Sequence, residues 1–330
     1  MGPEKKEAKK GKWVAYRPEV KVLDCTIRDG GLINNHRFTD EFVRAVYEAN
    51  VAAGVDYMEF GYKGSKRIFD SKEFGDWKFC DEDAIRRIVG DNPAEMKLSV
   101  MADAERCDYK DDILPKSESV IDMIRVACYI HQIPIAIEMV EDANTKGYET
   151  CCNIMAASTV HENDLREGLE ALADSPVDVV YLVDSFGSFY SEEIRELTKR
   201  YLKILSAKGK EVGIHMHNNQ QLGFANTIEG MISGANYLDA TINGMGRGAG
   251  NCPLELLLGF LHNPKFNVRP LLKCIQEQCL PLQSEMEWGY QLPYMVTGLL
   301  NQHPRTAIKM RAGETPDDYV GFWDQMVGSD

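Results

Sequence analysis

The sequence predicts a (β/α)8 barrel, the TIM-barrel fold class, and three observations favour it. Short runs of apolar and β-branched residues alternate with longer segments in which apolar residues recur at helical spacing. The runs follow one another at intervals of roughly 25–35 residues, which is the length of a strand–helix unit. Eight such runs can be counted, and this number suits a closed barrel better than a six-stranded open sheet.

Each predicted strand is an apolar run that ends at a polar or glycine-rich turn, as a strand leading into a helix should. The strands are expected at residues 22–27, 55–61, 97–103, 121–129, 150–157, 177–184, 212–217 and 237–243. Between them, apolar residues spaced three or four apart predict amphipathic helices. These helices are expected at residues 39–53, 135–146, 162–173, 192–208 and 222–234.

The alternation of strands and helices defines three regions. Residues 1–20 open with the charged run MGPEKKEAKKGK, which has too few apolar side chains to offset the entropy of ordering, so we expect a flexible basic tail. A targeting or anion-binding arm is the alternative. Residues 21–265 form the catalytic barrel. Residues 266–330 form a C-terminal helical extension, with helices broken at Pro270, Pro281, Pro293 and Pro304.

Composition excludes several classes of protein. The chain has 330 residues, and 37 Lys and Arg against 51 Asp and Glu give a formal charge of −14. This balance argues against nucleic acid as a partner, because affinity for a polyanion comes mainly from Lys and Arg. No apolar run approaches the roughly 18–20 residues that span a bilayer, so no membrane partner is expected. Nine cysteines without a CxxC pair indicate reduced thiols and a cytoplasmic protein.

The first chemistry-bearing cluster is DCTIRDGG, residues 24–31, at the end of the first predicted strand. Active sites of TIM barrels lie at the carboxyl ends of the strands. Asp29 can serve there as an oxygen ligand for a divalent metal, and Arg28 as a clamp for a carboxylate or enolate. The alternative is an exposed ion pair before a glycine turn.

The second cluster is GIHMHNN, residues 213–219, which closes the seventh predicted strand. Side chains two positions apart on a strand point to one face, so His215 and His217 project together. Two imidazoles at a barrel mouth favour a metal site. The alternative is a pair of histidines hydrogen-bonded within the top of the barrel.

The third cluster is NGMGRGAGN, residues 243–251, after the eighth predicted strand. Its four glycines let backbone N–H groups approach an anion beside a helix start, and Arg247 adds a positive charge. Asn251 can add an oxygen ligand to the metal. The alternative is a merely flexible loop.

Asp29, His215 and His217 together offer one carboxylate and two imidazoles, with Asn251 nearby. Barrel closure makes the first, seventh and eighth strands neighbours, so residues almost 190 positions apart can share one site. The mixed nitrogen and oxygen set suits Mn²⁺ above all, with Mg²⁺ or Zn²⁺ as alternatives.

Further polar residues at strand ends are candidates for substrate binding or for orienting a ligand: Glu59, Arg125 and Asp184. Glu59 and Asp184 can equally cap the following helix or hydrogen-bond within the barrel.

These motifs in combination resemble the pyruvate-handling, metal-dependent barrels of the HMG-CoA lyase-like superfamily. The resemblance covers about residues 20–262 and rests on Asp-x-Thr-x-Arg-Asp-Gly, His-x-His-Asn and Gly-x-Gly-x-x-Ala-Gly-Asn, in family order. It implies that Asp29, His215 and His217 hold the metal with Asn251 near it, and that Arg28 steadies the enolate.

Within the superfamily, the 4-hydroxy-2-oxovalerate aldolases are the most similar branch. VYLVDSFG (180–187), IRVA (124–127) and GYQLPY (289–294) resemble their segments, and the last implies an acid role for Tyr290. One position departs from the aldolase pattern: Leu32 stands where those enzymes carry a histidine base. His36, four residues further on, is a candidate substitute.

The resemblance implies a metal-dependent lyase that makes or breaks a C–C bond beside a small 2-oxo acid. A Claisen-type enzyme condensing acyl-CoA with a 2-oxo acid is the first alternative, and a catalytically retired barrel acting as a scaffold, suggested by Leu32, is the second. The same likeness implies a homo-oligomer, most simply a dimer, and an aldehyde dehydrogenase partner.

Overall fold

The computed structural model describes residues 17–328, and these residues form a closed barrel of eight parallel strands in sequential order. The first strand pairs with both the second and the eighth, which closes the sheet. The strands are β1 (Lys21–Asp24), β2 (Tyr57–Tyr62), β3 (Lys97–Asp103), β4 (Met123–Cys128), β5 (Glu149–Ile154), β6 (Val179–Asp184), β7 (Glu211–Met216) and β8 (Tyr237–Ala240). All eight predicted strands are confirmed, with shifts of a few residues at their ends.

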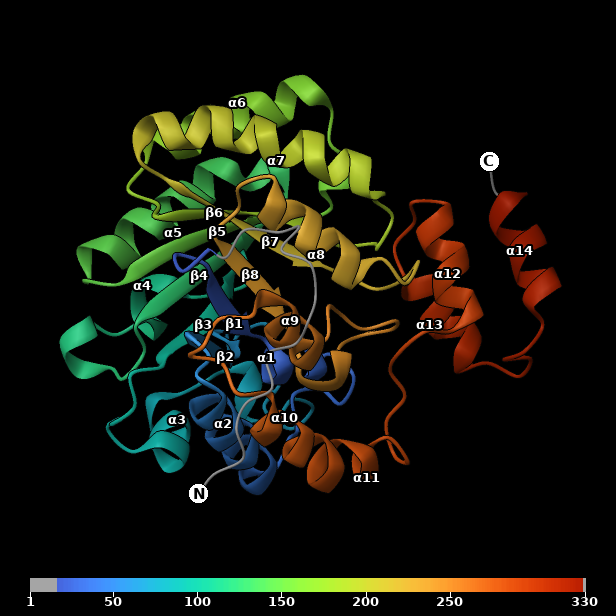
Figure 1. Cartoon of the computed structure of the whole chain (residues 1–330), viewed down its shortest axis with the longest axis horizontal. Helices are drawn as coiled ribbons and strands as arrows, with labels where there is room; N and C mark the ends of the chain where they lie inside the picture. Colours follow the sequence, from blue (N-terminus) through green and yellow to red (C-terminus); the bar gives the residue numbers. More distant parts are fainter. Residues whose placement is uncertain (1–16, 329–330) are drawn as a thin grey trace.

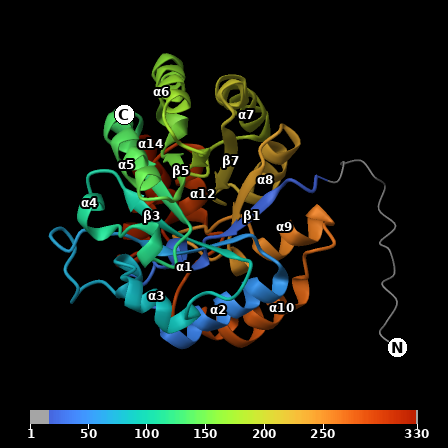
Figure 2. The same ribbon diagram turned by 90° about the vertical axis from the view of Figure 1, so that its left-hand side faces the viewer.

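A ring of helices surrounds the strands, as Figure 2 shows. One α-helix follows each strand in turn: α2 (Asp40–Ala53), α3 (Glu82–Val89), α4 (Tyr109–Asp112), α5 (Ile133–Thr145), α6 (Glu162–Asp174), α7 (Ser191–Leu205), α8 (Gly223–Ile232) and α9 (Leu254–Leu261). Short 3₁₀ turns lie between them: η1 (Asp76–Lys78), η2 (Lys116–Glu118), η3 (Ile130–Gln132), η4 (Ala157–Thr159), η5 (Ser206–Lys208) and η6 (Ile242–Gly244). The apolar faces of the helices pack on the outside of the sheet and form the largest buried cluster.

The inside of the barrel holds a second, smaller apolar layer that includes Leu23, Tyr57, Met123 and Tyr181. Charged side chains lie above this layer toward the carboxyl ends of the strands, and these are the residues of the candidate site described below.

The C-terminal extension consists of helices, as predicted. It comprises α10 (Val268–Cys274), the π-helix η7 (Ile275–Cys279), α11 (Leu280–Leu282), α12 (Leu292–Leu299), α13 (Arg305–Arg311) and α14 (Tyr319–Val327). α10 packs beside α2, whereas α12, α13 and α14 stand on another side of the barrel (Figure 1).

Three of the four prolines at which the helices were expected to break lie at or near helix starts. Pro293 and Pro304 lie at the starts of α12 and α13, and Pro270 lies in the first turn of α10. Pro281 does not break the chain of helices as expected, because η7 and α11 continue from α10 without interruption. The wider π turn just before Pro281 accommodates its ring and its missing N–H.

The expected basic tail falls mainly on residues 1–16, which lie outside the described residues. Residues 17–20 are packed rather than free. Val20 is buried, and the Arg17 guanidinium donates to the carbonyl oxygen of Ala235. Among the helices of residues 17–328, none has the length and apolar character that a bilayer crossing requires.

Candidate active site

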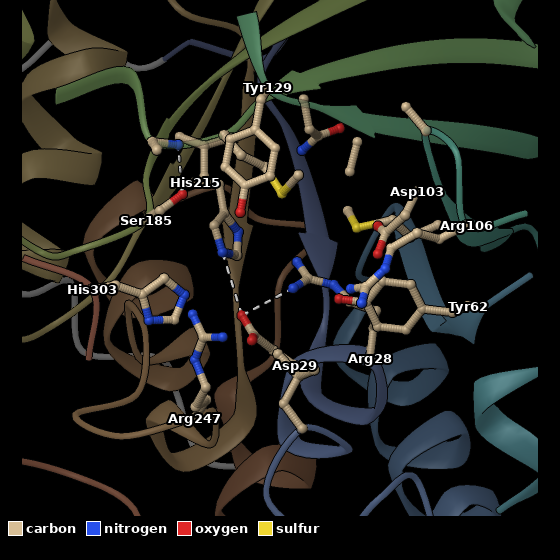
Figure 3. A pocket seen from close by; sticks show the side chains of 18 of the residues that line it. Arg28, Asp29, Tyr62, Asp103, Arg106, Tyr129, Ser185, His215, Arg247 and His303 are labelled. Carbon is tan, nitrogen blue, oxygen red and sulfur yellow. Dashed lines mark hydrogen bonds and ion pairs between the residues drawn. The ribbon is translucent and has the colours of Figure 1, made fainter. Parts of the chain in front are cut away.

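A cavity of about 560 Å³ opens at the carboxyl ends of the strands. Its wall includes Arg28, Asp29, His215, His217 and Arg247, which come from the three sequence clusters. Figure 3 shows Arg28, Asp29, His215 and Arg247 facing one another across it. The barrel therefore brings together segments that lie far apart in the chain.

The turn after β1 places Arg28 and Asp29. The strand ends at Asp24, earlier than the expected residue 27, because the Asp24 carboxylate accepts the backbone N–H of Thr26 and turns the chain. A short helix, α1 (Thr26–Gly30), follows in place of an open glycine turn. Arg28 and Asp29 are both buried, so the alternative of an exposed ion pair is wrong.

Gly31 serves packing in this turn rather than the approach of a ligand. A Cβ atom there would lie 2.2 Å from Nδ1 of His36, so the imidazole fits only because residue 31 is glycine.

Asp29, His215 and His217 form a tight cluster whose ligand atoms lie within 4.8 Å of one another. His215 Nε2 lies 3.3 Å from Asp29 Oδ2, and the Asn251 amide nitrogen donates to that oxygen at 2.9 Å. Three buried atoms in this cluster have no hydrogen-bond partner among residues 17–328: Asp29 Oδ1, His215 Nε2 and Asn251 Oδ1. Leaving such atoms unpaired is costly, and a bound cation would satisfy all three. The donor set therefore fits a divalent metal ion.

A second layer of side chains orients the cluster. His215 Nδ1 lies 2.9 Å from Asp239 Oδ2, which directs the Nδ1 proton to this carboxylate and leaves the Nε2 lone pair for a ligand. Arg125 also donates to Asp239, at 2.5 Å, and to Glu59, at 2.9 Å. The Glu59 carboxylate in turn accepts a hydrogen bond from Arg28 Nε at 2.8 Å. A chain of ion pairs inside the barrel thus holds both His215 and Arg28 in place.

The protonation states suit metal binding. Burial lowers the pKa of His217 to about 3, so its imidazole is neutral at pH 7. Burial alone would raise the pKa of Asp29, but the Arg28 guanidinium and the two imidazoles hold it well below its usual range. Burial alone would lower the pKa of His215, but the carboxylates of Asp239 and Asp29 raise it. A metal ion therefore competes with a proton at His215 Nε2.

The glycine-rich loop contributes less backbone than expected. The N–H groups of Gly244, Met245, Gly250 and Asn251 donate to carbonyl oxygens within or just before the loop and are not available to a ligand. Their role is to fold the loop back so that Asn251 pairs with His217. The loop reaches the cavity through the Arg247 side chain.

Three residues predicted for substrate binding do not line the cavity. Arg125 is fully buried inside the barrel, with its guanidinium 4.4 Å above the Tyr181 ring, and Glu59 lies between Arg28 and Arg125. Asp184 accepts the backbone N–H groups of Ser188 and Phe189 in the loop after β6, so it holds this loop and does not cap α7, which begins at Ser191. All three support the site without facing a substrate.

The two candidates for acid–base chemistry are not in the cavity either. His36 is buried with its ring edge against Tyr62, and burial with the nearby Lys78 charge lowers its pKa to about 3. Tyr290 is 42% exposed on the segment before α12 and does not line the cavity. Leu32 does line it, so an aliphatic side chain faces the substrate space.

Sequence reasoning missed four cationic or imidazole side chains of the wall: Lys78, Arg106, His303 and Arg305. Lys78 and Arg106 stand in loops after β2 and β3, which carry no recognisable motif. His303 and Arg305 flank Pro304 in the extension, which reaches the barrel mouth because Asn219 Nδ2 donates to the Tyr294 carbonyl oxygen. The available clue was Pro304, which marks a helix start and hence a loop before it.

A closed (β/α)8 barrel with a carboxylate–imidazole cluster at its carboxyl-terminal mouth defines the TIM-barrel enzyme class with a candidate metal centre. The family model HMGL-like matches residues 19–276, and the chain belongs to this family. The resemblance to HMG-CoA lyase-like barrels is thereby confirmed. Aldolases of this family depend on a divalent metal.

Characterised relatives agree with this assignment. The chain is 33% identical to an oxaloacetate decarboxylase of Mycobacterium tuberculosis over 75% of this chain and 71% of that protein. It is 31% identical to a 4-hydroxy-2-oxovalerate aldolase of Thermus thermophilus over 78% and 73%.

Solved structures share the fold. The N-terminal domain of a candidate aldolase from Bacteroides vulgatus superposes with a TM-score of 0.74 at 29% identity, covering 88% of this chain and 96% of that one. Hydroxymethylglutaryl-CoA lyase from Pseudomonas aeruginosa superposes with a TM-score of 0.62 at 16% identity, covering 80% and 93%, and shows the fold alone.

Proposed function

We propose that the protein is a divalent-metal-dependent lyase that makes or breaks a C–C bond next to the oxo group of a small 2-oxo acid, through a pyruvate-type enolate. The proposal is carried by three buried atoms without a hydrogen-bond partner among the described residues, on Asp29 and His215 at the cavity wall and on Asn251, which donates to Asp29. The aldolase and decarboxylase relatives support it, since both names describe reactions at such a bond.

Asp29, His215 and His217 would hold the metal, with the Asn251 carbonyl oxygen beside it. We propose Mn²⁺, because a set of one carboxylate, one amide oxygen and two imidazoles mixes the oxygen and nitrogen ligands that this ion accepts. Zn²⁺, which also binds two imidazoles and a carboxylate in catalytic sites, and Mg²⁺ are the alternatives that metal titration distinguishes. When bound, the ion would supply Lewis-acid stabilisation of negative charge on the oxo acid.

Arg28 would stabilise the same charge from the other side. Glu59 fixes its Nε, and Asp29 lies 3.2 Å from its Nη1. Its Nη2 has no partner within the described part of the chain and is available to a substrate oxygen. In a partly dry cavity, such a fixed charge stabilises a developing enolate more strongly than it would in water.

Aldol cleavage also needs a group that takes the proton of the 4-hydroxyl. Loss of this proton forms the aldehyde C=O, the C3–C4 bond breaks, and its electron pair enters the enolate, which is then protonated at C3. We assign the proton acceptor to His303, whose imidazole lines the cavity beside Phe186. Its Nδ1 accepts the backbone N–H of Arg305 at 3.1 Å, so this contact has to break before Nδ1 can take the hydroxyl proton. Burial and the charges of Arg247 and Arg305 lower its pKa to about 4, so it is neutral and able to accept a proton at pH 7.

Decarboxylation of a 3-carboxy-2-oxo acid is the second candidate, and Leu32 favours it. In that reaction the C–C bond electrons enter the enolate as CO₂ leaves, and no hydroxyl proton has to be removed. An aliphatic residue at the position where the aldolases carry a base is compatible with this reaction.

Exchange of the pyruvate methyl protons in D₂O, followed by NMR with and without Mn²⁺ or Mg²⁺, tests the proposal. We expect metal-dependent exchange that is lost in Asp29→Asn and retained in a variant of His161, which is exposed and does not line the cavity. Exchange that is absent with every metal, or equal in Asp29→Asn, would refute the function. Assays with 4-hydroxy-2-oxovalerate and with oxaloacetate then distinguish the two reactions, because an aldolase consumes the first compound and a decarboxylase the second.

The family likeness further supports a homodimer and an aldehyde dehydrogenase that takes up the aldehyde product. All nine cysteines are free thiols, which supports a cytoplasmic location.

A further inference from the structure

Lys78 is a buried cation that forms no direct ion pair among the described residues, although the Asp103 carboxylate of the same cavity wall acts on its charge. The residue is 5% exposed and lines the cavity from the turn η1. Within residues 17–328, its ammonium group has no hydrogen-bond acceptor and no carboxylate within 4.0 Å. Lys63, on the same loop, is also buried but donates to the carbonyl oxygen of Cys80.

Aromatic rings hold the Lys78 ammonium in place. Its Nζ lies 4.2 Å from the Tyr62 ring centroid and 3.9 Å from the Phe69 centroid. Such contacts offset part of the cost of burying the charge, but they satisfy none of the three N–H donors that an ammonium carries. The donors remain for a ligand in the cavity.

Arg106 belongs to the same group. Its guanidinium carbon lies 5.4 Å from the Phe69 centroid, so the two cations share one aromatic ring. Arg106 also lines the cavity, and its side chain has no ion pair with any described residue. Asp103, on the same cavity wall, offsets one of these two positive charges. The other positive charge remains for an anionic group of a ligand.

Lys78 and Arg106 lie apart from Arg247, which is nearer to the cluster of Asp29, His215 and His217. Figure 3 shows Arg106 with Tyr62 on one side of Arg28, and Arg247 with His303 on the other side of Asp29. Arg247 lines the cavity on the side of Asp29, so Arg247 suits the carboxylate of the oxo acid itself. Lys78 and Arg106 would then face a different part of the substrate.

We infer that the cavity holds a second anion subsite, formed by Lys78 and Arg106, for a carboxylate or phosphate on the part of the substrate remote from the 2-oxo acid group. This inference rests on the proposed function. It specifies the substrate class as 2-oxo acids, or their aldol adducts, with an additional negative charge at the far end.

Competition with pyruvate in the exchange reaction provides the test. The full chain, loaded with Mn²⁺, is titrated with three inhibitors that share the 2-oxo acid group: 2-oxoglutarate, 2-oxo-4-phosphonobutanoate and the uncharged isostere 5-methyl-2-oxohexanoate. We expect at least one anionic compound to inhibit at a concentration about tenfold or more below that of the isostere, as hydrogen bonds to a charged group imply. The tighter of the two identifies a carboxylate or a phosphate as the natural group.

Lys78→Met should reduce this preference by about tenfold, and Lys78→Arg should retain most of it. Arg106→Met should reduce the preference for anionic inhibitors in part. Because Arg106 is exposed, this variant should fold and provides the test if Lys78→Met does not fold. Lys66→Met is the matched control, because Lys66 lies on the same loop but pairs with Asp81 outside the cavity. Its preference should equal that of the wild type.

The outcomes separate the two proposals. Exchange without any preference for anionic inhibitors overturns the second subsite and leaves the proposed function standing. A preference that survives in both Lys78→Met and Arg106→Met also overturns it. Absence of exchange in the wild type refutes the proposed function itself.

Discussion

Acidification should destabilise the fold through His36, and the size of the effect follows from its burial. The pKa of this imidazole is about 3 in the folded chain against an ordinary value of 6.5, because burial and the nearby Lys78 charge disfavour the protonated form. Below pH 6.5 the unfolded chain takes up a proton that the folded chain refuses. The stabilising contribution is therefore complete above pH 6.5 and is lost progressively as the pH falls toward 3.

Between pH 7 and pH 5 this loss amounts to about 2 kcal/mol, since each pH step below 6.5 costs about 1.4 kcal/mol. Other buried groups titrate in the same range; burial raises the pKa of Asp24 to about 7 and that of Asp184 to about 6. Their contributions cancel when the wild type is compared with His36→Asn, because both proteins carry them. Asparagine is chosen because His36 has a left-handed backbone, with φ of 60°.

The assay is urea unfolding of both proteins at pH 7, 6 and 5, followed by tryptophan fluorescence. The free energy of unfolding of the wild type relative to the variant should fall by about 2 kcal/mol from pH 7 to pH 5. A difference that stays constant within about 0.5 kcal/mol would refute the reasoning, because His36 would then titrate as it does in the unfolded chain. Pyruvate exchange should persist in His36→Asn, since the imidazole does not reach the cavity.

Three further changes test the site and its supports. Asp239→Asn weakens the acceptor that orients His215, and Mn²⁺ affinity measured by calorimetry should fall about 10- to 100-fold; an unchanged affinity would contradict the orienting role. Gly31→Ala places a methyl group 2.2 Å from the His36 ring, and urea unfolding should show a loss of about 1–3 kcal/mol, whereas a neutral result would mean that the ring can move aside. Arg125→Met removes the guanidinium that the buried carboxylates of Glu59 and Asp239 share, leaving Glu59 with Arg28 alone, and should cost about 3–5 kcal/mol at pH 7, which a thermal melt that matches the wild type would disprove.

The barrel could be predicted from sequence because parallel strands buried on both faces are continuous apolar runs, and helices between them repeat at 3.6 residues. The clustering of Asp29, His215 and His217 could be predicted because His215 lies on β7, His217 directly follows that strand, and Asp29 lies in the turn after β1. Local residue spacing and closure of the barrel were sufficient to predict both the fold and this cluster. The turn after β1 could not be predicted, since it depends on hydrogen bonds that the Asp24 carboxylate accepts from Thr26 and from Asn50 of α2.

The remaining errors concern side chains whose environment is set by distant segments. Arg125 was expected to meet substrate, but Glu59 and Asp239, from two other strands, hold it inside the barrel. His303 was missed because its place at the cavity depends on how the extension docks, and no periodic pattern reports that docking.

The ion-pair chain inside the barrel has a consequence for the order in which ligands bind. Arg28 and Arg125 carry two positive charges against the three carboxylates of Asp29, Glu59 and Asp239, so the floor of the cavity bears one net negative charge. A divalent ion reverses this to one positive charge. The metal-free floor would repel an oxo acid and the metal-loaded floor would attract it, so the cation enters first. By thermodynamic linkage, a bound 2-oxo acid should raise the affinity for Mn²⁺ by the same factor by which bound Mn²⁺ raises the affinity for the 2-oxo acid. Titrations of each ligand with and without the other can measure this factor.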